Sequence, residues 1–156
     1  MSDADYISKS LANRGYDLII GGVNDKGMFG KIINNFKSRK IYLYTLKLYN
    51  EEVDKDINCM YLDTTFDRTK EIFKNSDKIL FLPGGTGSLS EILSMLEEKR
   101  TINSDKEIII YNQDGYYYDL IKFITKLIKN KFNDISILNY IKIFNDKDDL
   151  IKYLEV

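Results

Sequence analysis

The sequence contains no histidine and no tryptophan, and its 156 residues include one cysteine and one proline. Without histidine there is no serine–histidine–aspartate triad, no cysteine–histidine pair and no histidine-ligated metal. Acid–base chemistry must therefore come from carboxylates, lysine, tyrosine or water. The single cysteine, Cys59, excludes an intramolecular disulfide and predicts a reducing compartment, which we take to be the cytoplasm.

An excess of charge of one sign is also missing, because 23 basic side chains balance 24 acidic ones to give a net charge of −1. This balance excludes a strongly basic nucleic-acid binder, so no nucleic-acid partner is expected. No apolar run approaches the roughly 18 residues of a membrane span, so no membrane partner is expected either. The length suits a single core, and we predict one Rossmann-like nucleotide-binding domain over residues 1–156.

Short apolar segments alternate with amphipathic ones along the chain. The predicted strands are residues 17–20, 41–46, 59–62, 78–82, 107–111 and 140–144. The predicted helices are residues 3–14, 27–37, 65–75, 89–100, 115–131 and 147–154. Apolar strands between amphipathic helices indicate a mostly parallel sheet covered on both faces, which is a Rossmann-like three-layer α/β/α fold. The core-facing residues predicted for the helices over 89–100 and 115–131 are Leu89, Ile92, Leu93, Leu96, Leu120, Phe123, Ile124 and Leu127.

The most informative stretch is the turn that follows the strand over 78–82. It contains Gly84, Gly85, Thr86, Gly87 and Ser88, and three glycines in four positions let the backbone turn sharply and approach a ligand closely. The next helix is predicted to begin near Ser88, so its free amides and the positive end of its dipole face the same space. The turn therefore predicts an anion site, most naturally for phosphate, to which Ser88 adds a hydroxyl donor.

Glu91 follows this turn and has two interpretations. In the first, Ser88 and Glu91 form a capping box, which contributes about 1 kcal/mol to the helix. In the second, Glu91 faces the phosphate site as a catalytic carboxylate. Taken alone, the spacing favours the cap. An acid beside a phosphate is a poor choice for binding only, because like charges repel, and this argues for chemistry.

Arg68 lies in the first turn of the helix over 65–75 and is either a solvated surface residue or a bidentate phosphate ligand. If the strands over 59–62 and 78–82 are neighbours, Arg68 and Glu91 can face one cleft.

Two further groups of polar residues follow predicted strands. Asn24 and Asp25, in a glycine-bounded loop, either contact a ribose or solvate the turn. Tyr116, Tyr117 and Tyr118 open the helix over 115–131, where packing or a subunit contact is favoured over stacking on a purine.

Residues 83–91, Pro-Gly-Gly-Thr-Gly-Ser-Leu-Ser-Glu, resemble the P-G-G-x-G-T-x-x-E signature of the LONELY GUY proteins, with Ser88 in place of the usual threonine. These proteins are cytokinin riboside 5′-monophosphate phosphoribohydrolases, often labelled lysine decarboxylases. Arg68 resembles the arginine that is catalytic in the family, and residues 112–117 resemble its N-x-x-G-Y-Y segment. Gly21-Gly22 and residues 27–30 resemble its N-terminal glycine turn.

The resemblance implies hydrolysis of the N-glycosidic bond of a nucleoside 5′-monophosphate, either AMP or an N6-modified cytokinin precursor. It implies that Glu91 and Arg68 are catalytic and that the nucleotide binds residues of the two glycine turns, namely Gly21, Gly22, Gly84, Gly85, Thr86, Gly87 and Ser88. It further implies a homodimer and no metal or other cofactor.

This chain departs from the family in starting at the helix after the family's first strand and in having Thr69 where lysine is usual. A nucleotide-binding module without turnover and a diverged inactive paralogue are therefore the alternatives.

Overall fold

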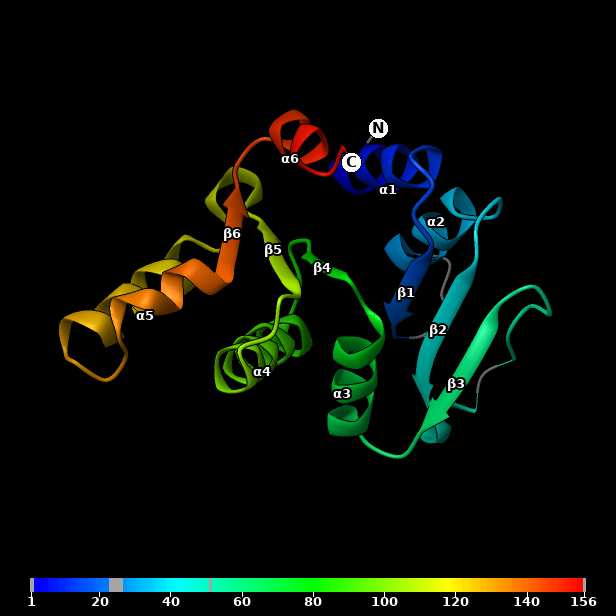
Figure 1. Cartoon of the computed structure of the whole chain (residues 1–156). Coiled ribbons are helices and arrows are strands. Elements are labelled where there is room, and N and C mark those ends of the chain that lie inside the picture. Colours follow the sequence, from blue (N-terminus) through cyan, green and yellow to red (C-terminus); the bar gives the residue numbers. More distant parts are fainter. Residues whose placement is uncertain (1, 23–26, 51, 156) are drawn as a thin grey trace. The chain divides into compact units, whose positions relative to one another are not determined.

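The computed structural model describes residues 2–22, 27–50 and 52–155, which divide into two compact units (Figure 1). Unit 1 is Met1–Ser76 with Tyr153–Val156, and unit 2 is Asp77–Lys152. Each unit contains a parallel sheet and helices that follow its strands, so the predicted α/β Rossmann-like fold class is confirmed. The prediction of one domain over the whole chain stays a prediction.

Unit 1 contains a sheet of strand order β1-β2-β3, in which all neighbours are parallel. Its elements in chain order are α1 (Asp3–Asn13), β1 (Leu18–Gly21), α2 (Met28–Asn35), β2 (Ile41–Leu46), the short 3-10 helix η1 (Lys47–Tyr49), β3 (Asn58–Leu62) and α3 (Thr65–Asn75). Helix α3 packs on all three strands through Ile72 and Phe73, which are buried. Gly15 follows α1 with φ +91°, a left-handed conformation that favours glycine and ends the helix.

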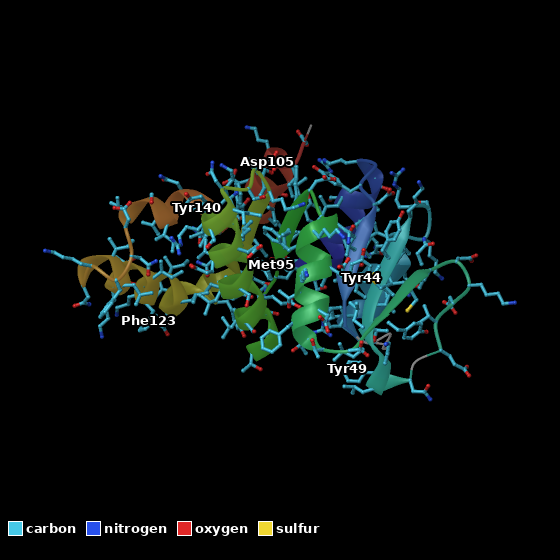
Figure 2. The ribbon with its side chains drawn as sticks, turned by 60° about the horizontal axis from the view of Figure 1, so that its bottom comes forward. Tyr44, Tyr49, Met95, Asp105, Phe123 and Tyr140 are labelled. Atoms are coloured by element: carbon cyan, nitrogen blue, oxygen red, sulfur yellow. The ribbon has the colours of Figure 1, made fainter. Side chains whose placement is uncertain are left out.

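Unit 2 contains a second parallel sheet, of strand order β4-β5-β6. Its elements are β4 (Lys78–Phe81), α4 (Thr86–Ile102), β5 (Glu107–Tyr111), the 3-10 helix η2 (Gln113–Gly115), α5 (Tyr118–Lys129), the 3-10 helix η3 (Ile135–Tyr140), β6 (Ile141–Phe144) and α6 (Lys147–Tyr153). The middle strand β5 is buried from Ile108 to Tyr111, as expected of a strand covered on both faces. Met95 of α4, labelled in Figure 2, is 1% exposed and belongs to the same core.

Two expectations about packing are wrong. On α4, Ile92 and Leu96 are buried as predicted, but Leu89 and Leu93 are largely exposed. On α5, only Ile124 of the predicted set is buried, and Phe123, labelled in Figure 2, is 56% exposed. Hydrophobic periodicity identifies the apolar side of a helix, but it does not say how much of that side another element covers.

Strand β3 pairs with β2 in the sheet of unit 1, and β4 pairs with β5 in the sheet of unit 2. That Arg68 and Glu91 face one cleft stays a prediction. None of the helices in the described part of the chain has the length and apolar character needed to cross a membrane.

Candidate functional site

The turn after β4 leads directly into the amino terminus of α4. Gly85 is the N-cap residue, with φ −85° and ψ −158°, and no side chain of the described residues caps the helix there. The first backbone bond at this end runs from the Leu89 N–H to the Gly85 carbonyl over 3.2 Å. The first amides of a helix have no acceptor within it, and here Gly85, Thr86 and Gly87 are exposed. These amides, with the helix dipole behind them, can bind an anion.

The three glycines of this turn differ in what surrounds them. A Cβ atom built on Gly84 would collide with the Ser88 Oγ and lie 2.9 Å from the Ser88 Cβ, so the side chain of Ser88 requires glycine at position 84. Among the described residues, a Cβ on Gly85 or Gly87 would meet no atom within 4 Å beyond its chain neighbours and the backbone of its own helix. Neither residue has a positive φ. Backbone conformation and packing therefore give no reason for glycine at 85 and 87, whereas close approach of a ligand does.

The position of Ser88 excludes the capping-box interpretation of Glu91. Helix α4 begins at Thr86 rather than near Ser88, so Ser88 is its third residue and cannot be its N-cap. Glycine is an acceptable N-cap, and Gly85 takes that place. Ser88 instead lies against Gly84 with its hydroxyl group.

Glu91 lies on the same stripe of α4 as the open glycine. It follows Gly87 by four residues, and residues four apart are stacked along one face of a helix. Side chains in a helix tilt toward its amino terminus, so helix geometry directs Glu91 toward the free space at Gly87. Glu91 is half-buried. An acid one turn behind an anion site is suited to act on a bound phosphorylated molecule.

Arg68 occupies a defined place in unit 1. Thr64 and Asp67 form a capping box, with the Asp67 N–H donating to the Thr64 Oγ1 over 3.1 Å and the Thr64 N–H donating to the Asp67 Oδ2 over 3.1 Å. This box fixes the start of α3 and thereby the position of Arg68, whose Nε is buried. A Cβ on Gly21 would lie 3.6 Å from the Arg68 Nε and 2.7 Å from the Ile72 Cδ1.

Gly22 continues the turn after β1. Its φ is +151°, which favours glycine, and it lies against the ring of Phe29. The structure thus brings Gly21 and Gly22 together with Arg68 in unit 1, and the residues from Gly84 to Ser88 together with Glu91 in unit 2. Asn24 and Asp25, the other candidates in the first turn, lie outside the described residues.

Two of the three consecutive tyrosines, Tyr116 and Tyr117, make contacts that sequence reasoning missed. Tyr117 is 1% exposed, in agreement with the favoured packing interpretation, whereas Tyr116 and Tyr118 are exposed. The Tyr117 hydroxyl donates to the Leu82 carbonyl and the Tyr116 hydroxyl to the Gly84 carbonyl, each over 2.7 Å. The tyrosines follow β5 in the sequence, and β5 pairs with β4, so the turn after β4 lies within their reach. Sequence alone does not identify that pairing.

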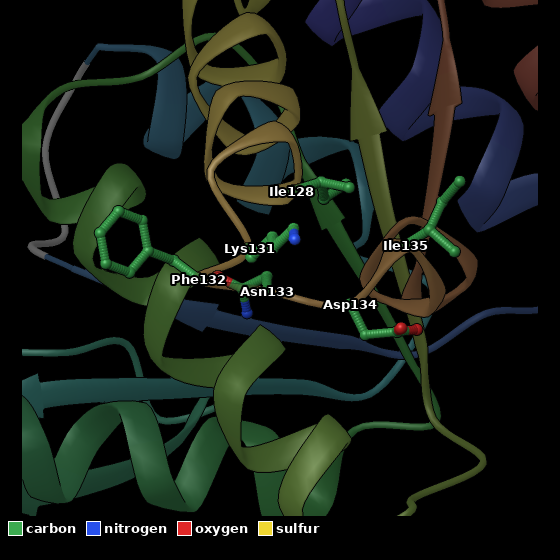
Figure 3. A pocket seen from close by; sticks show the side chains of 6 residues that line it. All are labelled: Ile128, Lys131, Phe132, Asn133, Asp134 and Ile135. Atoms are coloured by element: carbon green, nitrogen blue, oxygen red, sulfur yellow. The ribbon is translucent and has the colours of Figure 1, made fainter.

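The structure has an open pocket of about 460 Å³ elsewhere in unit 2, where α5 leads into η3 (Figure 3). Its lining residues are Ile128, Lys131, Phe132, Asn133, Asp134 and Ile135. None of the predicted site residues lines this pocket. The candidate residues therefore lie in the glycine turn of each unit and not in this pocket.

The chain belongs to the protein family described as possible lysine decarboxylase, whose model matches residues 21–154. The resemblance to the LONELY GUY proteins is confirmed by the curated relatives. A probable cytokinin riboside 5′-monophosphate phosphoribohydrolase of Oryza sativa subsp. japonica is 28% identical over 153 residues, which are 96% of this chain and 63% of the relative. A cytokinin riboside 5′-monophosphate phosphoribohydrolase of Arabidopsis thaliana is 26% identical over 153 residues, which are 96% of this chain and 72% of the relative.

The chain thus spans less than two thirds of the length of the rice relative. Both relatives carry the name of a phosphoribohydrolase.

Solved structures show the same fold at lower identity. The molybdenum cofactor carrier protein of Chlamydomonas reinhardtii has a TM-score of 0.71 and 17% identity, over 97% of this chain and 83% of that one. The molybdenum cofactor binding protein of the phototrophic bacterium Rippkaea orientalis has a TM-score of 0.66 and 18% identity, over 98% and 84%. At these identities the similarity shows a shared fold alone.

Proposed function

We propose that this chain hydrolyses the N-glycosidic bond of a nucleoside 5′-monophosphate and releases a free base and ribose 5-phosphate. The observation that carries the proposal is the amino terminus of α4. There, Gly85 and Gly87 leave space that the fold does not require, and Glu91 follows on the same face of the helix. The names of the curated relatives support the same chemistry.

The 5′-phosphate is proposed to bind the amides from Gly85 to Ser88. These donors are fixed by the helix before the ligand arrives, so the binding energy of the phosphate positions the ribose without reorganising the protein. Thr86 and Ser88 add hydroxyl donors at the same place. Gly87, which has no side chain, lets the phosphate come close to the backbone.

Glu91 is proposed to carry the chemistry. As the bond between C1′ and the base nitrogen breaks, positive charge develops on the ribose, as in glycoside hydrolysis. A carboxylate stabilises this charge and accepts a proton from the attacking water, whose oxygen bonds to C1′. The leaving base takes the bonding electrons and a proton. The step consumes one water and needs no oxidant or reductant.

Arg68 is proposed to bind a phosphate or ribose oxygen through its guanidinium fork. This role is supported by the resemblance and by the position of the side chain beside the Gly21 turn. We further propose AMP or an N6-modified cytokinin precursor as the substrate, a homodimer as the assembly and the cytoplasm as the location. Sedimentation at several protein concentrations tests the dimer.

The activity is tested by incubating the chain with AMP and with isopentenyladenosine 5′-monophosphate and separating the products by chromatography. Glu91→Gln should lower the rate of base release by about 10²- to 10⁴-fold, the range for loss of a general acid–base group. Glu98→Gln is the matched control, since Glu98 is exposed on the same helix and should leave the rate unchanged.

Equal base release by wild type and Glu91→Gln would remove Glu91 from the mechanism. Binding of AMP without base release would favour the alternative of a nucleotide-binding module.

A further inference from the structure

We propose that Tyr116 and Tyr117 are positioning residues that hold the glycine turn in the orientation required for phosphate binding. This inference rests on the proposed function, because it takes the glycine turn to be the phosphate-binding element. It assigns a role to two residues outside that turn. Its geometry comes from the hydrogen bonds that these two tyrosines make to the turn after β4.

The two hydroxyls bind carbonyl groups on either side of Pro83. Tyr117 donates to the carbonyl of Leu82 and Tyr116 to the carbonyl of Gly84, both at 2.7 Å. The rings support each other edge to face, with centroids 5.1 Å apart and planes at 87°. Two of the three carbonyls between β4 and the N-cap residue, those of Leu82 and Gly84, are therefore directed toward phenol groups.

The bond from Tyr116 also fixes an amide. Among the described residues no peptide bond is cis, and in a trans peptide the C=O and the N–H point in opposite directions. With the carbonyl of Gly84 held by Tyr116, the N–H of Gly85 in the same peptide unit points away from the tyrosine. Gly85 carries the first of the exposed amides at the start of α4. Rotation of this peptide would replace a donor by a carbonyl oxygen, which repels phosphate.

The tyrosine pair is itself anchored to the ends of two strands. The backbone N–H of Tyr117 donates to the Asn112 Oδ1 over 2.6 Å. Asn112, which is 6% exposed, donates from its Nδ2 to the Asn145 Oδ1 over 2.8 Å and from its backbone N–H to the Phe144 carbonyl over 2.8 Å. Positive φ values at Asp114 and Gly115 turn the chain back toward β4. Asn112 is buried, so its bonds to Tyr117, Asn145 and Phe144 hold the start of this segment in one arrangement.

Tyr116 provides the sharper test, because its side chain is 55% exposed and its hydroxyl is separate from the core. Tyr116→Phe removes one hydrogen bond and keeps the ring that packs on Tyr117. We expect the Kd for AMP to rise about fivefold to tenfold, the effect of one lost hydrogen bond, while the melting temperature stays within about 2 °C of wild type. Tyr118→Phe is the matched control, since Tyr118 is the equally exposed neighbour, at 63%.

Binding is measured by calorimetry and, separately, by the shift of the Gly85 amide resonance during titration with AMP. The Gly85 resonance should shift in wild type and in Tyr118→Phe and shift less in Tyr116→Phe at equal saturation. Equal AMP affinity and equal Gly85 shifts in wild type and Tyr116→Phe would overturn the positioning role. AMP binding without base release would overturn the hydrolase proposal alone. The positioning role would then still be decided by comparing AMP affinity and the Gly85 shift in wild type and Tyr116→Phe. Absence of AMP binding by wild type would overturn both proposals.

Discussion

Replacing Gly87 by alanine should stabilise α4 and at the same time weaken nucleotide turnover. Position 87 is in the first turn of the helix, and the added methyl group would meet no side chain of the described residues within 4 Å beyond its chain neighbours. Alanine is favoured over glycine in helices by up to about 1 kcal/mol, and it also reduces the freedom of the unfolded chain. For a chain of this size we expect the melting temperature to rise by about 1–4 °C.

The effect on activity should have the opposite sign. If phosphate occupies the space beside Gly87, the methyl group keeps it away from the amides at the start of α4. Loss of one charge-assisted hydrogen bond costs about 1.5–3 kcal/mol, which corresponds to roughly a 10- to 150-fold loss of kcat/KM. Stability and activity of the same variant therefore change in opposite directions.

The assay combines a thermal melt followed by circular dichroism with chromatography of the products formed from AMP. Gly84→Ala is the comparison, because a side chain at position 84 collides with Ser88 and should lower both stability and activity. Gly87→Ala with wild-type kcat/KM and wild-type affinity for AMP would refute the inference that a ligand requires glycine at this position.

Two other changes separate stability from function. Gly15→Ala should lower the free energy of unfolding by about 1–2 kcal/mol in urea titrations, because the φ of +91° is strained for alanine, and should leave KM for AMP unchanged. Burial raises the pKa of the Tyr117 hydroxyl above its ordinary value near 10, the neighbouring Tyr116 adds to the rise, and the Gly84 backbone opposes it. The unfolded chain then loses this proton at a lower pH than the folded chain, so the contribution of Tyr117 to stability is complete below pH 10 and is lost as the pH rises toward the folded pKa. Above about pH 9.5 the free energy of unfolding should therefore fall more steeply with pH in wild type than in Tyr117→Phe, and parallel slopes would contradict this assignment.

Much of the fold follows from local sequence. The strands Ile41–Leu46 and Glu107–Tyr111 have the predicted bounds, because each is a short apolar run between polar segments. The helix Thr65–Asn75 also has the predicted bounds, and its capping box is encoded within four residues. Such elements are determined by neighbours in the sequence.

The errors arise where the outcome depends on distant residues. Phe123 lies on the apolar side of α5, but its exposure depends on what the rest of the unit covers. The Ser88 and Glu91 spacing matches a capping box, but Gly85 caps the helix three residues earlier. The bond from Tyr116 to Gly84 joins residues 32 positions apart, and only the pairing of β4 with β5 brings them together.

The contact between Gly84 and Ser88 has a consequence for how this turn tolerates change. A side chain fits at either position but not at both, so the two residues form one steric unit. In a library randomised at both positions, functional clones should have glycine at position 84 and a residue with a hydroxyl group at position 88. Clones with alanine at position 84 should survive selection only when position 88 is glycine.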